Sequence, residues 1–207
     1  MKDTGAYEIC VAAETLSSLR AGAREFGFVP LENALSNELM AGLRAEALAQ
    51  RAIARPALGT DTNPYKSHIA ELGDFAQSFL TGSSVARLLQ AAFEQPFALS
   101  EHASCYTYYE PGHFLGRHRD RPVECAATLI IYLDAASPDP QSAQTGLSLL
   151  IFGEDGAGGT EPRAVIPTRI GTLVVGRGSF WHERPLLQPG EHVVALTACF
   201  SHSRRSA

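Results

Sequence analysis

The chain has 207 residues, of which 45% are hydrophobic and 19% are charged, and its formal net charge at pH 7 is −5. This length is typical of one domain and is enough for a sizeable core. The negative net charge argues against nucleic acid or an anionic membrane surface as a partner. No stretch of the sequence approaches the ~20 apolar residues that a membrane-spanning helix needs.

The cysteines carry information about the compartment. None of the four forms a CxxC pair, which argues against a structural zinc site and against a disulfide framework; they are Cys10, Cys105, Cys125 and Cys199. Scattered, unpaired cysteines favour a reducing compartment. The first residues include Asp and Glu and lack the apolar run of a signal peptide. We therefore expect a cytoplasmic protein.

The first predicted elements along the chain are two helices. Residues 34–52 place apolar side chains at helical spacing, with Ser36 as the expected N-cap. Residues 83–96 show a second apolar face, which begins at Ser83 or Ser84 and stops before Pro96.

The second half of the chain predicts strands. From Ala98 onward the sequence is a series of short β-rich segments, which are residues 104–109, 126–133, 146–152, 171–176 and 192–200. Turn-rich loops at 134–146 and 153–162 separate three of them. Several short strands without intervening helices predict an antiparallel sandwich or barrel. We expect one domain, in which 1–97 is a mostly helical flank with the first strands and 98–201 is the barrel core.

The densest polar cluster, GHFLGRHRDRP at 112–122, lies between two of these apolar segments. In extended backbone His118 and Asp120 project to the same face, and together they offer two ligands to a divalent metal. His182, which follows a distant apolar segment, is the candidate third ligand. Two histidines and one carboxylate form the facial triad typical of non-haem Fe(II) oxygenases, in which three coordination positions stay open.

The order of these residues resembles a known family. The chain supplies, in sequence, Tyr108 or Tyr109, Gly112, His118, Asp120, Thr128, the run Tyr132-Leu133-Asp134, Gly171, Leu173 and His182. Over residues 100–200 this pattern resembles the Fe(II)/2-oxoglutarate-dependent dioxygenases, and above all the short members that hydroxylate prolyl groups, free amino acids or other small metabolites. The resemblance implies a double-stranded β-helix, which is a jelly-roll barrel buttressed by helices.

The same resemblance implies an activity. Fe(II) would be the resident metal, 2-oxoglutarate and O2 the cosubstrates, and the reaction a hydroxylation or related oxidation of a C–H bond in a small molecule. An amino acid or a derivative of one is the expected substrate. Nothing in the sequence indicates an oligomeric state.

One feature departs from the family pattern. Members usually carry an arginine about ten residues past the distal histidine, where its planar guanidinium binds the far carboxylate of 2-oxoglutarate. Here the tenth residue is His192. We expect protonated His192 to replace the arginine with the Tyr132 hydroxyl as second donor, so that cosubstrate affinity falls as the imidazole loses its proton. Arg184, two residues past His182, and Tyr108 on the opposite wall are the other candidates.

Four charged residues are candidates for substrate binding. Glu101 would bind an amine and Arg55 a carboxylate, a pairing that fits an amino-acid-like ligand. Arg119 and Arg121, which flank Asp120, would reach a substrate carboxylate at the barrel mouth.

Two other functions stay open at this point. Residues 112–124 also read as G-x5-H-x-D-x3-E, close to the first motif of cupin barrels, which use metal without an oxo-acid cosubstrate; the later P-x-G-x-x-H motif of cupins is absent. A barrel that only binds ligands is the second alternative. The intact triad argues against a binding module, whereas the missing arginine favours it.

Overall fold

The computed structural model describes residues 9–61, 63–136, 145–155 and 159–203. Four α-helices are described: α1 (Ala13–Glu25), α2 (Asn37–Arg51), α3 (Asp74–Leu80) and α4 (Ser83–Phe93), with a short 3-10 helix at Glu101–Ala103. The strands are β1 (Phe28–Leu31), β2 (Arg55–Thr60), β3 (Asn63–Glu71), β4 (Phe97–Leu99), β5 (Cys105–Tyr109), β6 (Phe114–His118), β7 (Ala127–Ala135), β8 (Ser148–Gly153), β9 (Ala164–Pro167), β10 (Leu173–Arg177), β11 (Trp181–Arg184) and β12 (Val193–His202).

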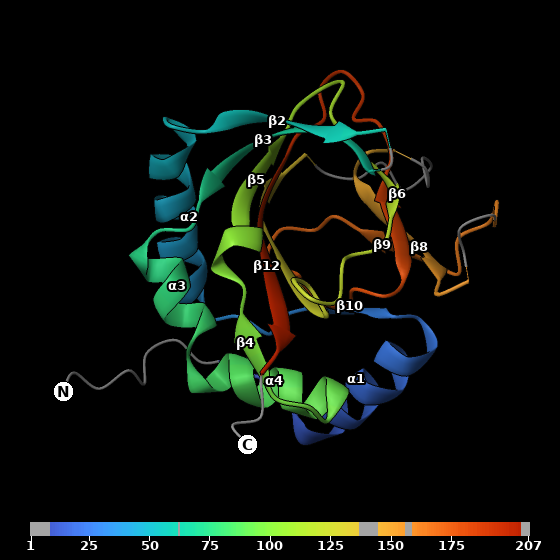
Figure 1. The fold of residues 1–207 in the computed structure, drawn as a ribbon. Helices are drawn as coiled ribbons and strands as arrows, with labels where there is room; N and C mark the ends of the chain where they lie inside the picture. Colours follow the sequence, from blue (N-terminus) through green and yellow to red (C-terminus); the bar gives the residue numbers. More distant parts are fainter. Residues whose placement is uncertain (1–8, 62, 137–144, 156–158, 204–207) are drawn as a thin grey trace.

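All the described strands belong to one sheet. Its main path runs β1-β10-β7-β12-β5-β3-β6-β11-β8-β9, while β2 pairs with β3 and β4 pairs with β12. Every pairing is antiparallel. The sheet curls so that β5 and β12 form one wall and β6 and β8 lie in the facing wall (Figure 1), where β11 pairs between them. The predicted jelly-roll barrel is therefore confirmed.

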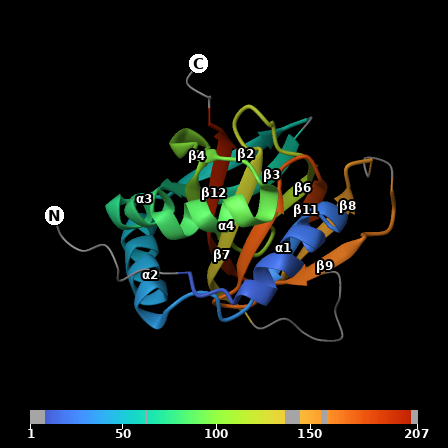
Figure 2. The same cartoon turned by 90° about the horizontal axis from the view of Figure 1, so that it is seen from below.

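Strand alternation separates the barrel interior from the helix-packed core. In β12 the side chains of Ala195 and Thr197 line an interior cavity. Their neighbours Leu196 and Ala198 are fully buried in the core beneath the helices. Residues two apart in a strand share a face, so this one strand serves both sides. The helices lie across the outer face of β7 and β12 (Figure 2).

The two predicted helices are present, close to their predicted limits. The hydroxyl of Ser36 accepts a hydrogen bond from the Leu39 amide at 3.2 Å, which caps α2 as expected. Helix α4 begins at Ser83 and ends at Phe93, and its C-cap Glu94 has a left-handed backbone with φ 58°. Helices α1 and α3 and strands β1 to β3 were not individually predicted. The described residues include no helix that is both long and apolar enough to cross a bilayer.

The cysteine prediction is wrong for two of the four residues. Cys125 and Cys199 form a disulfide, whereas Cys10 and Cys105 are thiols. The two bonded cysteines are 74 positions apart in the chain, so a search for close spacings does not find them. Pairing of β7 with β12, which sets Thr128 opposite Cys199, brings them together.

The partly buried carboxylate of Glu46 joins α2, α3 and β5. The Tyr106 hydroxyl donates to Glu46 at 2.7 Å, and the same carboxylate accepts the amides of Phe75 and Ala76 at 2.8 and 3.0 Å. The amides belong to the first turn of α3, where a negative charge is favourable. Glu46 thus holds the start of α3 and the outward face of β5 in place.

Replacing Glu46 by alanine should lower the free energy of unfolding by about 2–4 kcal/mol, because a buried hydroxyl and two amides lose their acceptor. Urea denaturation measures the change. Glu94→Ala is the control. The Glu94 carboxylate forms exposed ion pairs with Arg20 and Arg24, and such pairs contribute about 0–1 kcal/mol. Equal losses in the two variants would contradict this assignment.

Candidate metal centre and its cavity

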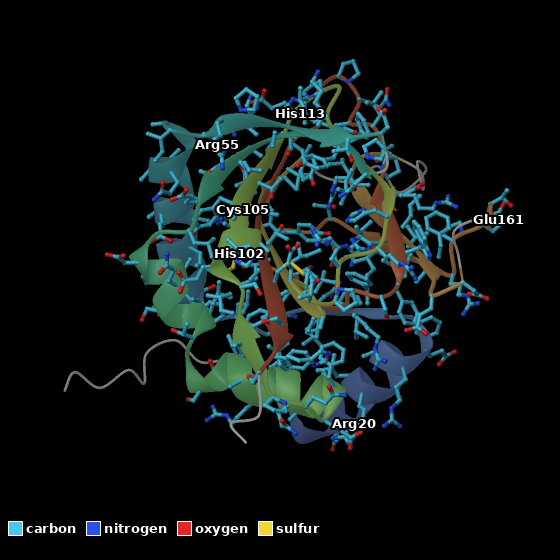
Figure 3. All side chains as sticks on the ribbon, in the orientation of Figure 1. Arg20, Arg55, His102, Cys105, His113 and Glu161 are labelled. Atoms are coloured by element: carbon cyan, nitrogen blue, oxygen red, sulfur yellow. A yellow bond between two sulfur atoms is a disulfide. The ribbon has the colours of Figure 1, made fainter. Side chains whose placement is uncertain are left out.

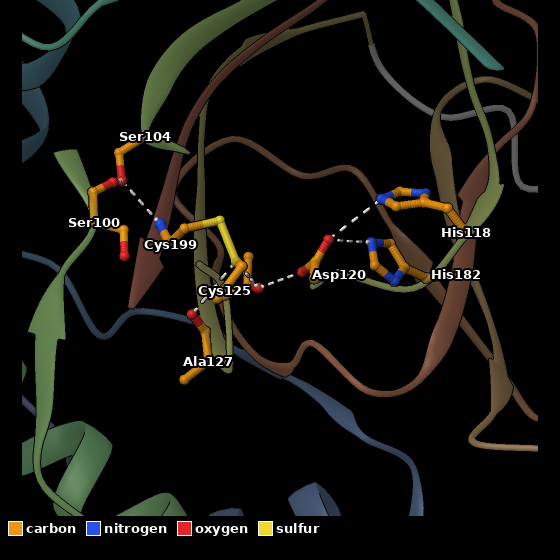
Figure 4. The surroundings of a disulfide bond; sticks show 9 residues. Ser100, Ser104, His118, Asp120, Cys125, Ala127, His182 and Cys199 are labelled. Carbon is orange, nitrogen blue, oxygen red and sulfur yellow. Dashed lines mark hydrogen bonds and ion pairs between the residues drawn. A yellow bond between two sulfur atoms is a disulfide. The ribbon is translucent and has the colours of Figure 1, made fainter. Parts of the chain in front are cut away.

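Strands β6 and β11 and the short segment after β6 bring the predicted triad together. His118 ends β6 and is the register partner of His182 in β11, with ring centroids 4.3 Å apart. Asp120 follows β6, and its amide donates to Gly178 O at 2.8 Å. Its Oδ1 lies 3.3 Å from His118 Nε2 and 3.9 Å from His182 Nε2 (Figure 4). One ligand atom from each of the three residues lies within 4.8 Å of the others.

The backbone fixes the orientation of both imidazole rings. Nδ1 of His118 lies 2.9 Å from the carbonyl oxygen of Gly116, and Nδ1 of His182 lies 2.9 Å from that of Phe180. A carbonyl oxygen only accepts, so each Nδ1 carries the proton and each Nε2 keeps its lone pair. Metal-binding histidines are typically oriented by such a second hydrogen bond. The donor set and its orientation therefore fit a divalent transition metal.

Protonation also favours a metal. Burial raises the pKa of Asp120, but the neighbouring imidazoles of His118 and His182 and the hydroxyl of Thr128 lower it more, so the pKa lies below its usual value. Burial lowers the pKa of His182 despite the opposing effect of Asp120. These shifts stabilise a carboxylate and a neutral imidazole, which are the forms that bind metal.

A cavity of 310 Å³ opens onto the triad, and Arg184 lines it. Only 4% of Arg184 is exposed. Its Nη1 donates to Gly146 O at 2.5 Å and to Thr168 Oγ1 at 2.8 Å, and its Nη2 donates to the Tyr132 hydroxyl at 3.0 Å. Among the described residues no carboxylate pairs with it. A buried cation without an anion is costly, so the cavity presents a binding place for an anionic group.

The structure corrects the expectation for His192. This residue precedes β12 and lies outside the cavity, with 47% of its side chain exposed and Nε2 3.4 Å from Asp134 Oδ2. It lines a different hollow, together with Arg44 and Arg51 on the helix side of the sheet. The tenth residue after His182 therefore lies just before β12 begins, and its side chain does not face the metal centre.

Tyr108 does not lie on the cavity wall where the sequence analysis expects it. Its hydroxyl donates to Ala47 O in α2 at 2.6 Å, so it faces the helices. Its neighbour Tyr109 lines the cavity instead, and its ring centroid lies 5.3 Å from the Arg184 guanidinium carbon. Burial raises the pKa of Tyr109 to about 12, so this hydroxyl stays protonated. Thr107, two residues earlier in β5, also lines the cavity, so Tyr109 shares its face of the strand while Tyr108 points to the helices.

Two of the four substrate candidates lie together. Arg55 and Glu101 line one hollow of 440 Å³, which shares Cys105 and His102 with the metal cavity. Figure 3 shows Arg55, His102 and Cys105 along the same side of the barrel.

The other two candidates do not line the metal cavity. Arg119 is exposed and lies over the Trp181 ring at 5.6 Å. Arg121 pairs with Glu124 at 3.5 Å, with 75% of its side chain exposed.

A second group of potential ligands, His68, Glu110 and His113, is engaged elsewhere. Their candidate atoms also lie within 4.8 Å of one another. Glu110 forms an ion pair with Arg51, however, and His113 Nδ1 accepts the Glu110 amide at 3.1 Å. These contacts stabilise the turn between β5 and β6.

Comparison with known proteins gives no match to any family model and none to a curated protein. Solved structures do match. A prolyl-4-hydroxylase from Pseudomonas putida is 20% identical with a TM-score of 0.65, over 91% of this chain and 99% of that chain. A 2OG-Fe(II) oxygenase family oxidoreductase from Burkholderia pseudomallei is 16% identical with a TM-score of 0.69, over 99% and 100%.

A third similar structure is the alpha ketoglutarate-dependent epimerase SnoN from nogalamycin biosynthesis. It is 16% identical with a TM-score of 0.73, over 92% of this chain and 82% of that chain. SnoN has also been solved with Fe3+, alpha ketoglutarate and nogalamycin RO. At these identities the likeness concerns the fold. The chain has the jelly-roll fold of the 2-oxoglutarate/Fe(II) oxygenases, as the sequence resemblance implies.

Proposed function

We propose that this protein is a non-haem Fe(II)/2-oxoglutarate-dependent oxygenase that oxidises a C–H bond of a small molecule. The observation that carries the proposal is the convergence of His118, Asp120 and His182 on one point of a cavity that also holds the unpaired cation of Arg184. Bound iron, with 2-oxoglutarate and O2, would supply the oxidising chemistry, while the protein supplies geometry and exclusion of water.

The triad residues would hold the metal from one side. His118 and His182 present Nε2 and Asp120 presents Oδ1, so three positions on the far side stay open for cosubstrates. The two backbone-bonded imidazoles keep this geometry without help from the ligand. Such preorganisation lowers the cost of binding the metal.

Arg184 would bind the far carboxylate of 2-oxoglutarate in place of the missing arginine. A guanidinium has five N–H donors, and Gly146, Thr168 and Tyr132 accept three hydrogen bonds from it. The contacts at Nη1 fix the plane of the guanidinium. None of the described residues bonds to its Nε, so this edge would meet the carboxylate of the cosubstrate. Ala195, the register partner of Tyr132 in β12, is small and lines the cavity, which leaves space for this longer side chain from β11.

The cupin alternative receives less support. It requires Glu124 beside the triad histidines, but Glu124 forms an ion pair with Arg121 and is not in the group of potential ligands around His118. A barrel that only binds ligands also receives less support. Such a protein would not need three metal donors held together beside a buried cation, and this cavity has both.

Succinate formation from 2-oxoglutarate tests the proposed function. The protein is loaded with Fe(II) and supplied with O2 and a panel of free amino acids and other small metabolites. We expect slow Fe(II)-dependent succinate release alone and faster release with a true substrate. Metal-loaded protein that forms no succinate, with or without the panel, would contradict the proposal.

We further propose an amino-acid-like substrate that extends from the metal cavity into the hollow lined by Arg55 and Glu101. The charged residues that line this hollow are Arg55, Glu71 and Glu101, so it offers both a cation and carboxylates to a zwitterion. Its carboxylate would face Arg55 and its ammonium would face Glu101, so the remainder of the molecule would reach the metal centre past Cys105.

Arg55→Ala should therefore raise KM for the best amino acid by roughly tenfold, the effect of losing one partly solvated charged hydrogen bond. The affinity for 2-oxoglutarate should not change. Steady-state kinetics of Arg55→Ala, Glu101→Gln and the control Arg121→Ala give the comparison. An unchanged KM in both Arg55→Ala and Glu101→Gln would exclude this hollow as the substrate site.

A further inference from the structure

The carboxylate of Asp120 is held by more than its histidine neighbours. Its Oδ1 faces His118 and His182, whereas its Oδ2 accepts a hydrogen bond from Thr128 Oγ1 at 2.9 Å. Thr128 is 3% exposed and is the second residue of β7. Because Oδ2 is held by Thr128, Oδ1 faces the position between the two histidines.

Thr128 in turn contacts the disulfide. Cys125 Sγ lies 3.3 Å from Thr128 Oγ1, and Cys199 is the register partner of Thr128 in β12. A disulfide sulfur carries no hydrogen and is only a weak acceptor, so the single hydroxyl hydrogen of Thr128 goes to the stronger acceptor, the carboxylate of Asp120. In the reduced state Cys125 is a thiol and gains a weak donor. The oxidation state of this pair therefore changes the donors around Thr128.

The disulfide also anchors the segment that carries Asp120. The Cys125 amide donates to Arg121 O at 2.8 Å, and the Asp120 amide donates to Gly178 O at the same distance. A Cβ added at Gly178 would lie 2.0 Å from Cys125 O and 2.9 Å from Asp120 Cβ, so this turn is tightly packed. The S–S bond links its end to β12.

The other end of the bond is fixed in place. The Cys199 amide donates to Ser104 Oγ at 2.9 Å, and the Ser104 hydroxyl donates to Ser100 O at 2.8 Å (Figure 4). Cys199 also lines the metal cavity, which gives a small reductant a route to the sulfur. The pair is thus a bridge from a rigid strand to the turn that bears a metal ligand.

We propose that Thr128 and the Cys125–Cys199 disulfide position Asp120, so that metal affinity depends on the oxidation state of the two cysteines. In the switching step a dithiol reductant gives two electrons and two protons; the S–S bond breaks, two thiols form, and the reductant becomes a disulfide. The oxidised protein binds the metal tightly and the reduced protein binds it weakly. This inference rests on the proposed metal centre and does not require 2-oxoglutarate turnover.

The test measures Co(II) binding under anaerobic conditions, by calorimetry and by the visible spectrum of the bound ion, without cosubstrate. Thr128→Val should raise the Kd about tenfold to a hundredfold, the usual effect of removing a group that supports a metal ligand, and Thr128→Ser should restore it. The Cys125→Ala/Cys199→Ala double variant, which has no thiols to bind Co(II), should show a similar loss.

Wild-type protein that is reduced with dithiothreitol should bind Co(II) more weakly in the same way, after anaerobic removal of the dithiol, which would itself bind the metal. Alkylation with mass spectrometry should show two additional reactive cysteines. Cys105→Ser is the control for the free thiol near the cavity and should respond as the wild type does. Thermal unfolding accompanies each titration, because a merely structural disulfide would lower Tm and leave the Kd unchanged.

Equal Co(II) affinities in wild type, Thr128→Val and the double-cysteine variant would overturn the inference while leaving the metal centre intact. Four reactive cysteines before reduction would also overturn it. Wild-type protein that does not bind Co(II) would instead overturn the proposed metal centre and this inference with it.

Discussion

Alanine at His118, Asp120 or His182 is expected to abolish Fe(II) binding and 2-oxoglutarate-dependent turnover while the protein stays folded. Each variant removes one of three donors whose candidate atoms lie within 4.8 Å of one another. The loss in affinity should exceed the ~10–100-fold that follows from removing a group that only supports a ligand. Each side chain lies at the cavity and none belongs to a hydrophobic core cluster, so folding should continue.

Anaerobic Fe(II) titration measures the affinities, and circular dichroism checks the fold. His202→Ala is the control, since His202 is exposed and stacks on Phe97 at the end of β12. It should bind iron as the wild type does. Wild-type iron affinity in any one of the three alanine variants would exclude that residue as a ligand.

The second large effect is expected at Arg184. Two charged hydrogen bonds from its guanidinium to the cosubstrate would contribute about 1.5–3 kcal/mol each. Arg184→Met should therefore weaken 2-oxoglutarate binding by roughly 10²–10⁴-fold with Fe(II) affinity retained. Arg184→Lys should recover only part of the loss, because a lysine keeps the charge but lacks the planar pair of donors. Tyr132→Phe should weaken 2-oxoglutarate binding about tenfold.

His192→Ala is the matched control for this series. His192 lies outside the cavity beside Asp134, so its loss should not change cosubstrate affinity at any pH between about 6 and 8.5, the range in which histidine charge changes. Isothermal titration of the Fe(II) protein at several pH values makes the comparison. Unchanged affinity in Arg184→Met, or a loss in His192→Ala at acidic pH, would return the anchoring role to His192.

Features governed by strand alternation were predictable from the sequence. The HxD spacing places His118 and Asp120 on one face, and the structure has them 3.3 Å apart. The N-cap at Ser36 and the apolar faces of α2 and α4 follow from short-range patterns. These features depend on residues close together in the chain, whose relative geometry the backbone period determines.

Features that depend on where a strand begins were not predictable. His192 matches the family spacing, but β12 begins at Val193, and Arg184 from β11 reaches the interior instead. Within the YTYY run, the choice between Tyr108 and Tyr109 depends on which face of β5 meets the helices. The seven-residue α3 is too short to show a clear period, and the edge strand β2 exposes most of its side chains.

The disulfide shows the same limit over a longer distance. Nothing near Cys125 in the sequence indicates Cys199, and only the β7–β12 pairing brings them together. The contact from Thr128 to Asp120 is likewise visible only in three dimensions, although the sequence marks Thr128 as part of the family pattern. Local patterns therefore brought out the three proposed ligands, whose side chains the structure places together, but not the residues that support them.

The central claim is that one cavity binds Fe(II) through the triad and 2-oxoglutarate through Arg184. The most direct measurement is the visible absorption of the protein under anaerobic conditions after addition of Fe(II), of 2-oxoglutarate, and of both. A weak charge-transfer band that needs both additions, and that is lost in His182→Ala and greatly weakened in Arg184→Met, is the expected result. Fe(II)-loaded wild-type protein that develops no band at saturating 2-oxoglutarate would contradict the claim.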